Sequence, residues 1–241
     1  YATVLGNPAG GEEEGIRYAG LLNVYLDFDL ERILGINNTK LVVSGAWASG
    51  RSLSDEDIGN FFTASEVFSG RGVRLYQLFL MSEFFDGELN ISLGRMAIAD
   101  EFASSPIFYN YVNTAIDGHP ISLSINDQAF FSDPQSSLGA RARWNPDDSF
   151  YVMAGVYNSN PIVADNDNRG LDFSLSKGVI LISEAAYLLN PPGSGELEGV
   201  YKLGVFYDTG RFDKLSREDE SVSGNYGLYM ILQQMIYREN T

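Results

Sequence analysis

Hydrophobic and polar residues alternate along strand-length stretches of this chain. On the clearest stretch the apolar positions are Leu22, Val24, Leu26, Phe28 and Leu30, and the positions between them are Asn23, Tyr25, Asp27, Asp29 and Glu31. Successive side chains of a β-strand point to opposite faces, so this stretch has one apolar and one acidic face. Similar stretches predict about nine strands, near 18–33, 39–51, 73–85, 89–99, 139–145, 149–157, 179–189, 199–209 and 225–238.

Short and long connections alternate between these strands. Tight turns at 85–88 and 145–148 alternate with long polar segments at 53–72, 102–138 and 158–177. A soluble β-sandwich has short hairpins at both ends, whereas short turns on one rim and long loops on the other are typical of outer-membrane barrels. Aromatic residues gather at the expected strand ends, as interfacial girdles require: Tyr18, Trp47, Phe84, Phe85, Trp144, Phe150, Tyr187 and Tyr237.

The pattern therefore predicts an all-β fold, an antiparallel transmembrane β-barrel, with residues 1–241 forming a single domain. Residues 1–15 contain two adjacent glycines and three adjacent glutamates, and we expect them to be a flexible end. The first residues have neither the basic nor the apolar region of a signal peptide, so an exported protein would already have lost it.

The composition excludes several classes of protein. Hydrophobic residues make up 44% of the 241 residues and charged residues 20%, which is too apolar for disorder and too polar for a helical membrane protein. Apolar runs such as 179–182 fall far short of the roughly 18 residues that a membrane helix needs. Cysteine is absent, which excludes disulfides and thiolate chemistry. The net charge of −16 disfavours nucleic acid as a partner.

Several blocks, in order along the chain, resemble the OprB family of carbohydrate-selective outer-membrane porins. The blocks are Val4–Gly11, Arg74–Leu80, Phe84–Leu89 with Leu93–Arg95, Tyr201–Gly204 with Asp208–Gly210, and Gly224–Tyr229 with Tyr237–Glu239. The resemblance implies a barrel of about sixteen strands with long loops folded inward, through which small sugars such as glucose diffuse passively across the outer membrane.

The expected nine strands are about half of such a barrel, and Thr241 is not the aromatic residue on which outer-membrane strands commonly end. We therefore expect a fragment or a split barrel. Open strand edges cannot lie in lipid, so the expected partners are the missing strands, on the rest of the protein or on a second chain. Sugars, membrane lipid and lipopolysaccharide are the other expected partners, and a homo-oligomer stays open.

Parity along the strands nominates side chains that line the pore or bind sugar. They are Tyr25, Asp27 and Asp29, then Gln77 and Glu83, then Arg141 and Arg143, with Glu184, Lys202, Asp208 and Arg74 as further candidates. Arg141 and Arg143 share one face and cannot comfortably meet lipid, where each costs about 2–4 kcal/mol. A ladder of charges that stiffens the wall is the alternative to sugar contact.

Arg95 is ambiguous, because parity from Leu89, Ile91 and Leu93 places it in lipid. A bulge at Gly94 would turn it inward, in which case Arg95, Asp100 and Glu101 begin the long constricting loop. Otherwise Arg95 is an interfacial arginine whose side chain reaches the headgroups.

The sequence offers little for catalysis or for a resident metal. Asp27 and Asp29 lie on one strand, whereas a glycosidase needs acid and base from different segments. The single histidine, His119, lies in a polar loop. Residues 165–170 resemble a calcium loop, but Arg169 stands where a ligand is needed. We expect no enzyme and no cofactor. A weakly bound divalent cation such as calcium, at acidic loops such as 218–220, is the one ligand left open.

Three functions remain in view. The first is a sugar-selective diffusion pore. The second is a blocked or non-selective barrel with a structural or anchoring role, plugged by the loop at 102–138. The third is a soluble β enzyme or lectin-like domain, which could not carry apolar faces of this kind in solution.

Overall fold

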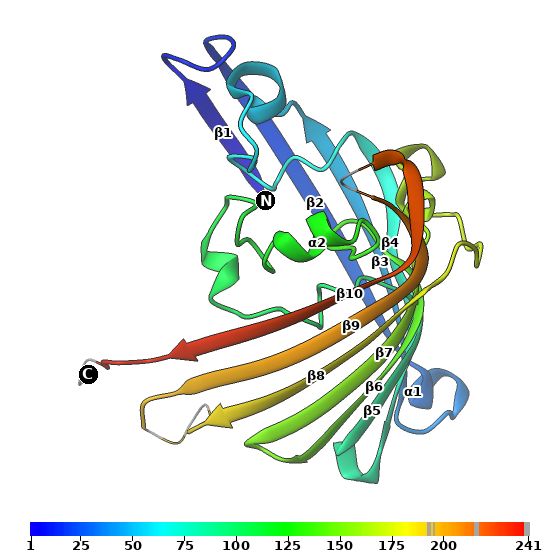
Figure 1. The fold of residues 1–241 in the computed structure, drawn as a ribbon. Coiled ribbons are helices and arrows are strands. Elements are labelled where there is room, and N and C mark those ends of the chain that lie inside the picture. The colour runs from blue at the N-terminus through cyan, green and yellow to red at the C-terminus, as the bar shows by residue number, and fades with distance from the viewer. Residues whose placement is uncertain (192–193, 195, 215–216, 239–241) are drawn as a thin grey trace.

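The computed structural model describes residues 1–191, 194, 196–214 and 217–238 of the chain. Its strands form a single ten-stranded antiparallel sheet in which each strand pairs with its neighbours in sequence. The strands are β1 (Ala2–Asn7), β2 (Gly15–Asp29), β3 (Thr39–Gly50), β4 (Gly72–Phe84), β5 (Leu89–Met96), β6 (Ser137–Asp147), β7 (Phe150–Asn158), β8 (Val179–Leu189), β9 (Gly199–Lys214) and β10 (Arg217–Gln234). The sheet is strongly curved (Figure 1).

Helices are few and short. They are α1 (Leu30–Leu34), α2 (Ser122–Asn126), a π-helical turn η1 (Ser54–Ile58), and four 3₁₀ turns, η2 (Phe85–Gly87), η3 (Phe108–Asn110), η4 (Pro161–Ala164) and η5 (Asn166–Asn168). In the part of the chain that the structure describes, no helix has the length and apolarity to span a membrane.

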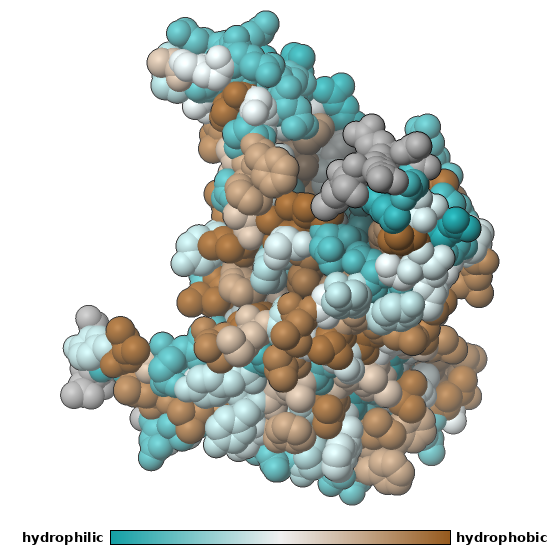
Figure 2. All heavy atoms as spheres, in the orientation of Figure 1, coloured by the Kyte–Doolittle hydropathy of each residue, from teal (hydrophilic) through white to brown (hydrophobic). Residues whose placement is uncertain are grey.

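The two rims of the sheet differ as the sequence predicts. Short connections follow β2, β4, β6 and β8 at one rim, and long segments follow β3, β5 and β7 at the other. The turn after β4 has positive φ at both Phe85 and Asp86 and ends at Gly87, which closes the hairpin tightly. The end of the molecule around the β1–β2 turn is mainly hydrophilic, whereas hydrophobic residues spread over the strands (Figure 2).

The convex face of the sheet carries the apolar half of the alternation. Leu22, Val24 and Leu26 are 54%, 51% and 50% exposed. The ladder places Trp47, Gly45 and Val43 of β3 opposite them, on the same face. Exposed aliphatic and aromatic residues continue across the sheet as far as Leu228, Met230 and Leu232 on β10. Such an extended exposed apolar face requires a lipid or protein cover.

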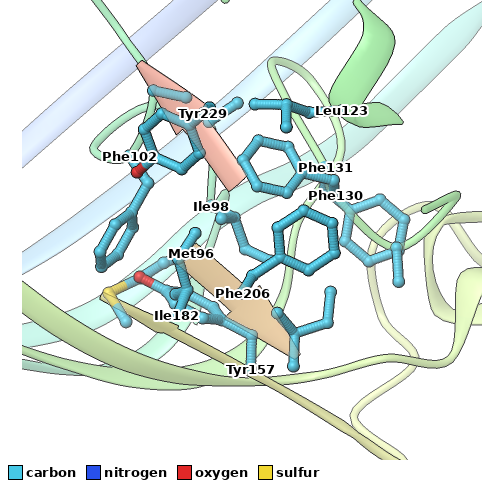
Figure 3. Close-up of a cluster of buried hydrophobic side chains, with 14 of the residues drawn as sticks. Met96, Ile98, Phe102, Leu123, Phe130, Phe131, Tyr157, Ile182, Phe206 and Tyr229 are labelled. Atoms are coloured by element: carbon cyan, nitrogen blue, oxygen red, sulfur yellow. The ribbon is translucent and has the colours of Figure 1, made fainter. Parts of the chain in front are cut away.

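Part of the concave face is covered by the segment between β5 and β6, residues 97–136, which we call the inward segment. Its Ile98, Phe102 and Phe130 are fully buried and pack against the inner side chains of β7 to β10. Figure 3 shows this cluster, with Phe206 from the wall beside Phe130, their ring centroids 6.0 Å apart. Along β7 to β10 the inner face is therefore partly apolar and covered, unlike the acidic face expected for residues 23–31.

This packing explains an irregularity in the sequence pattern. Residues 179–182 form an unbroken apolar run instead of alternating, because Ile180 and Ile182 face the inward segment while Leu181 faces outward. A strand covered on both faces loses its alternation.

Two expectations about local structure are corrected. Residues 2–7 are not part of a flexible end: they form β1, paired along its whole length with β2, so the sheet has ten strands instead of about nine. Residues 218–220 belong to β10 and not to a loop, and Glu220 forms an ion pair with Lys214. Glu239 and Thr241 lie outside the described residues.

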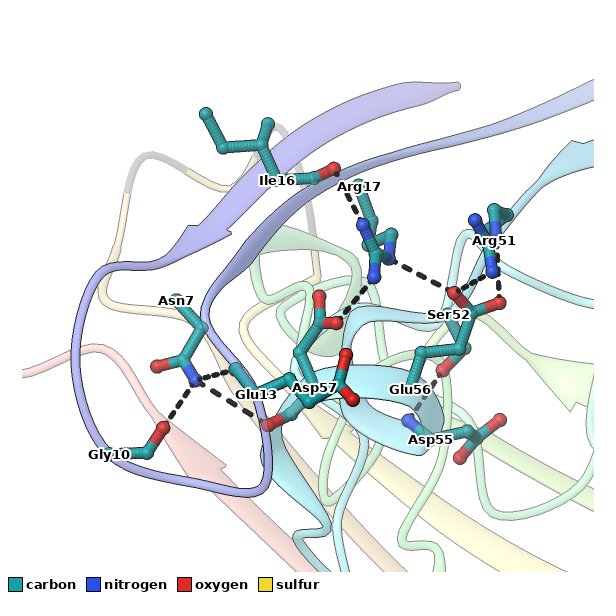
Figure 4. A network of polar contacts seen from close by, with 10 residues as sticks. All are labelled: Asn7, Gly10, Glu13, Ile16, Arg17, Arg51, Ser52, Asp55, Glu56 and Asp57. Carbon is teal, nitrogen blue, oxygen red and sulfur yellow. Dashed lines mark hydrogen bonds and ion pairs between the residues drawn. The ribbon is translucent and has the colours of Figure 1, made fainter.

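A polar network holds the β1–β2 end in place. Arg17 forms ion pairs with Glu56 and with the buried Asp57 of η1, at 3.0 and 2.6 Å. The Asn7 side chain donates to the carbonyls of Gly10 and Glu13 across the turn (Figure 4). The ion-pair partners are about 40 residues apart in sequence, which is why the alternation pattern did not reveal this ordering.

Candidate functional site

Glu184 is the centre of the contacts that fix the inward segment to the wall. This carboxylate is 1% exposed and accepts hydrogen bonds from the hydroxyls of Tyr151 and Tyr229, at 2.6 and 2.8 Å. The backbone N–H of Ala103, at the start of the inward segment, donates to it at 2.9 Å. The buried Glu184 carboxylate is thus satisfied by hydrogen bonds, one of which comes from the loop that lies on the sheet.

Lys202 extends this centre. Its ammonium lies 3.6 Å from the Glu184 carboxylate and donates to the carbonyl of Ser104 at 2.8 Å. One residue further along the inward segment, the Ser105 hydroxyl donates to Gln233 of β10 at 2.6 Å. Side chains from β8, β9 and β10 therefore converge on residues 103–105, and Lys202 and Glu184 act as a buried structural pair.

Arg141 and Arg143 both point to the concave face, as parity predicts. Arg141 forms an ion pair with Glu101 of the inward segment and also donates to Asn90. The Arg143 guanidinium lies over the Tyr151 ring, 3.9 Å from its centroid, and donates to Asn145. Arg141, almost fully buried, is thus paired with a carboxylate, whereas Arg143 contacts an aromatic ring and an amide.

Arg95 also faces inward, so the interfacial alternative is wrong. Gly94 has a φ of +145°, and a Cβ there would collide with the Leu78 carbonyl oxygen, which explains why glycine stands at this position. The Arg95 guanidinium, 1% exposed, donates to the carbonyls of Asp172, Ser136 and Val163. It therefore ties the 159–178 connection to the end of the inward segment.

Arg74 makes the same kind of contact from β4, donating to the Ala164 carbonyl at 2.7 Å and to Asp165. Both arginines use their forked donors on backbone carbonyls, which are plentiful where irregular loops fold inward. These contacts occupy both guanidinium groups, so neither arginine is available to bind a solute in this structure.

Gln77 lies inward because of a register shift opposite Ser44 and Gly45 of β3. The shift lets two consecutive residues, Tyr76 and Gln77, both be buried on the concave side. Both donate to the carboxylate of Asp100 in the inward segment. Burial raises the pKa of Asp100 to about 7, against the two donors, which lower it.

Some of the remaining candidate side chains are exposed, and the others are buried or bound to groups of the protein itself. Tyr25 is 53% exposed and Asp27 is also exposed, both on the concave side of β2. Glu83 is exposed near the short-turn rim. Asp29 is committed locally: it caps α1 and pairs with Arg32. Asp208, 1% exposed, is buried under the inward segment.

An acidic cavity of about 150 Å³ lies between the inward segment, residues 66–67 and the start of the sheet. Its polar lining consists of carboxyls and tyrosines with one histidine and one serine: Tyr1, Glu66, Asp100, Tyr109, Tyr111, Asp117, His119, Ser132 and Asp133. Apart from Asp100 and His119, none of these was singled out from the sequence. They lie in loops, where strand parity gives no signal.

The cavity shifts the acid–base properties of its lining. Burial, reinforced by the charges of Asp117 and Asp133, raises the pKa of Glu66 to about 8. Burial likewise raises the pKa of Asp133 to about 6, although Asn23 donates to it. At neutral pH the cavity therefore holds a mixture of neutral and charged carboxyls.

The described residues hold no cluster of three or more acidic, histidine or cysteine side chains that could bind a metal. His119 is buried, donates to or accepts from Ser124 at 2.8 Å and stacks on Phe130. Residues 166–168 form the 3₁₀ turn η5, in which the Asp165 carboxylate accepts from the backbone N–H of Asp167. These contacts are structural.

The chain is similar in sequence to two known porins. The chain is 28% identical to Porin B of Pseudomonas aeruginosa, over 93% of this chain and 53% of that protein. It is 25% identical to the putative porin QuiX of Acinetobacter baylyi, over 92% of this chain and 52% of that protein. The chain thus spans about half the length of the curated relatives it matches.

The structure is similar to a solved structure of Pseudomonas putida OprB at high pH. The TM-score is 0.86 at 27% identity, covering 97% of this chain and 59% of the other. A family model described as "Carbohydrate-selective porin, OprB family" matches residues 13–241. The chain belongs to the OprB family of carbohydrate-selective porins.

Proposed function

We propose that this chain forms about half of an outer-membrane β-barrel through which small sugars diffuse passively. The observation that carries this proposal is the two-sidedness of the sheet. Its convex face is apolar and exposed, while its concave face binds a long inward segment through buried charges. A sheet built in this way has lipid on one side and a loop-narrowed lumen on the other.

Completion of the barrel requires further strands. Within the described residues, β1 and β10 each pair on one side only. Unpaired backbone groups cost several kcal/mol each in hydrocarbon, so both edges have to be covered in the membrane. We propose that the remaining strands come from the rest of the protein or from a second chain, and that membrane lipid and lipopolysaccharide surround the finished barrel.

The solute path in this proposal runs beside β1 to β3 and not beside β6 to β10. Tyr25 and Asp27 are open to the concave side, and the acidic cavity lies close by, at Leu21. Tyrosine faces suit the C–H surfaces of sugar rings, and carboxyls accept hydrogen bonds from hydroxyls. Transit involves binding and release with no bond chemistry.

Liposome swelling tests this function. The complete protein, purified in detergent and reconstituted, should admit glucose faster than amino acids of similar size. Equal rates for the two solutes would leave a general pore and remove the sugar selectivity. Absence of swelling, together with absence of single-channel conductance, would instead make the inward segment a plug and the barrel a structural component.

A further inference from the structure

Two buried carboxyl groups interact with each other where the inward segment meets β9. Asp127 follows the last residue of α2, and Asp208 lies in β9, and each is 1% exposed. They are adjacent to the apolar cluster, since Phe130 and Phe206 are in contact on the same two elements. The pair therefore lies at the attachment of the inward segment to the wall.

Each carboxylate uses one oxygen in an ordinary hydrogen bond. Oδ1 of Asp127 accepts from the N–H of Ala129 at 3.0 Å, and Oδ1 of Asp208 accepts from the N–H of Gly210 at 2.6 Å. The second oxygen of each, Oδ2, is buried and has no hydrogen-bond partner among the described residues. Two buried carboxylates that interact, with no donor between them, repel unless a proton or a cation joins them.

The described residues around the pair supply no compensating charge. In the described part of the chain neither carboxyl forms an ion pair with a lysine, arginine or histidine. The titratable group that faces Asp127 from β9 is Asp208, and β10 contributes the neutral amide of Asn225. Asn225 also donates to the Asn126 carbonyl at 2.7 Å, which holds α2 close to the wall.

We propose that Asp127 and Asp208 share one proton, and that this carboxyl–carboxylate pair is a pH-sensitive latch that holds the inward segment on β9. When the proton is lost, two buried negative charges face each other and the contact weakens. The segment then loosens at α2, while its attachment at Glu184 persists.

The acid–base behaviour of Asp127 agrees with this geometry. Burial, followed by the interaction with Asp208, raises the pKa of Asp127 to about 7, although the Ala129 N–H and Asn225 lower it. Protonated Asp127 can donate to Asp208, so each carboxyl gains a partner at its second oxygen. The latch is closed below neutral pH and opens above it.

A spin label on α2 tests the latch directly. The chain has no cysteine, and Ile125 is 53% exposed, so the substitution I125C gives one labelling site on α2. In the complete reconstituted protein we expect the mobile fraction of the nitroxide to rise about threefold between about pH 6 and about pH 8.5. A pH-independent spectrum would overturn the proposal.

Amide variants identify the groups responsible. In D127N and in D208N the new amide donates to the remaining carboxylate, so the label should stay immobile over the whole pH range. D148N, in the exposed turn after β6 and outside every site described, should keep the wild-type rise. A rise that survives in D127N or D208N, or a label mobile at every pH in either, would contradict a shared proton.

A cation is the competing occupant of the pair. If calcium suppresses the rise and a chelator makes the label mobile at about pH 6, the carboxyls bind a cation and the proton latch is wrong. Heat-dependent electrophoretic mobility checks that each variant forms a folded barrel, and D127N, outside the sheet, provides a readable variant if D208N does not fold.

Discussion

The inner faces of β2 and of β7 to β9 follow the same alternation, but the first is exposed and the second is covered by the inward segment. On β2, Tyr25 and Asp27 remain open. On β8 and β9, Glu184 and Phe206 are buried beneath the inward segment. The difference shows that an inward polar residue does not by itself line a pore, because the loop that covers the wall decides whether a charge meets water or becomes a buried fixing point.

The largest expected effect comes from a substitution in the part of the sheet that the inward segment covers. Substitution of Glu184 by alanine leaves Lys202 buried without its carboxylate and removes the acceptor of two tyrosines and of Ala103. Loss of one partner of a buried pair costs about 3–5 kcal/mol. We expect a lower urea midpoint and, in folded protein, a larger and noisier single-channel conductance.

The matched control for this variant is Glu196→Ala. Glu196 is exposed in the connection between β8 and β9, and its loss should change stability by no more than about 0.5 kcal/mol. Equal effects of the two substitutions would contradict the role given to Glu184.

The second prediction compares the two faces of the open strand. Arginine at position 26 faces outward and should cost about 2–4 kcal/mol in a bilayer. Arginine at the adjacent position 27 faces the lumen and should leave stability nearly unchanged while shifting ion selectivity towards anions. Unfolding in liposomes and reversal potentials measure the two effects, and a larger stability loss for Asp27→Arg than for Leu26→Arg would reverse the assignment of the faces.

The third prediction separates the two arginines of β6. Arg141→Ala leaves Glu101 without its partner and should cost about 1.5–3 kcal/mol. Arg143→Ala removes a contact with the Tyr151 ring and should cost about 0.5–1 kcal/mol. Hydrogen exchange at residues 99–104 should increase in the first variant and not in the second. Similar protection in both variants would show that Arg141 does not fix the segment.

The smallest expected effect concerns the acidic cavity. The pKa of Glu66 is raised to about 8, so the folded state holds this proton more tightly than the unfolded chain does. The resulting stability is fully present below about pH 4 and is lost as the pH rises through 8. Glu66→Gln should therefore show a weaker decline in urea midpoint between about pH 5 and about pH 9 than the wild type. An unchanged decline would mean that Glu66 does not titrate in the cavity.

Much of the fold was predictable because strand parity is a local signal. The apolar face through Leu22, Val24 and Leu26, the two unequal rims and the inward direction of Arg141 and Arg143 all followed from it. β1 was missed because its six residues adjoin a glycine- and glutamate-rich turn that resembles a flexible end.

The site was less predictable, since its contacts join residues far apart in sequence. Parity nominated Glu184, Lys202 and Asp208 correctly as inward residues, but it could not show that the inward segment buries them. The acidic cavity is built from loops. Loops have no repeating pattern from which the direction of a side chain can be predicted. Glu66 and Asp133 come together only in the folded chain, where they line the same cavity.

Paired cysteine labelling on β2 tests most directly whether the two faces of the sheet meet lipid and water. The chain has no native cysteine, so L26C and D27C each provide a unique thiol on adjacent residues. In the complete protein in liposomes, a charged maleimide should modify D27C rapidly and leave L26C nearly unmodified. Rapid modification of L26C with protection of D27C would contradict the account.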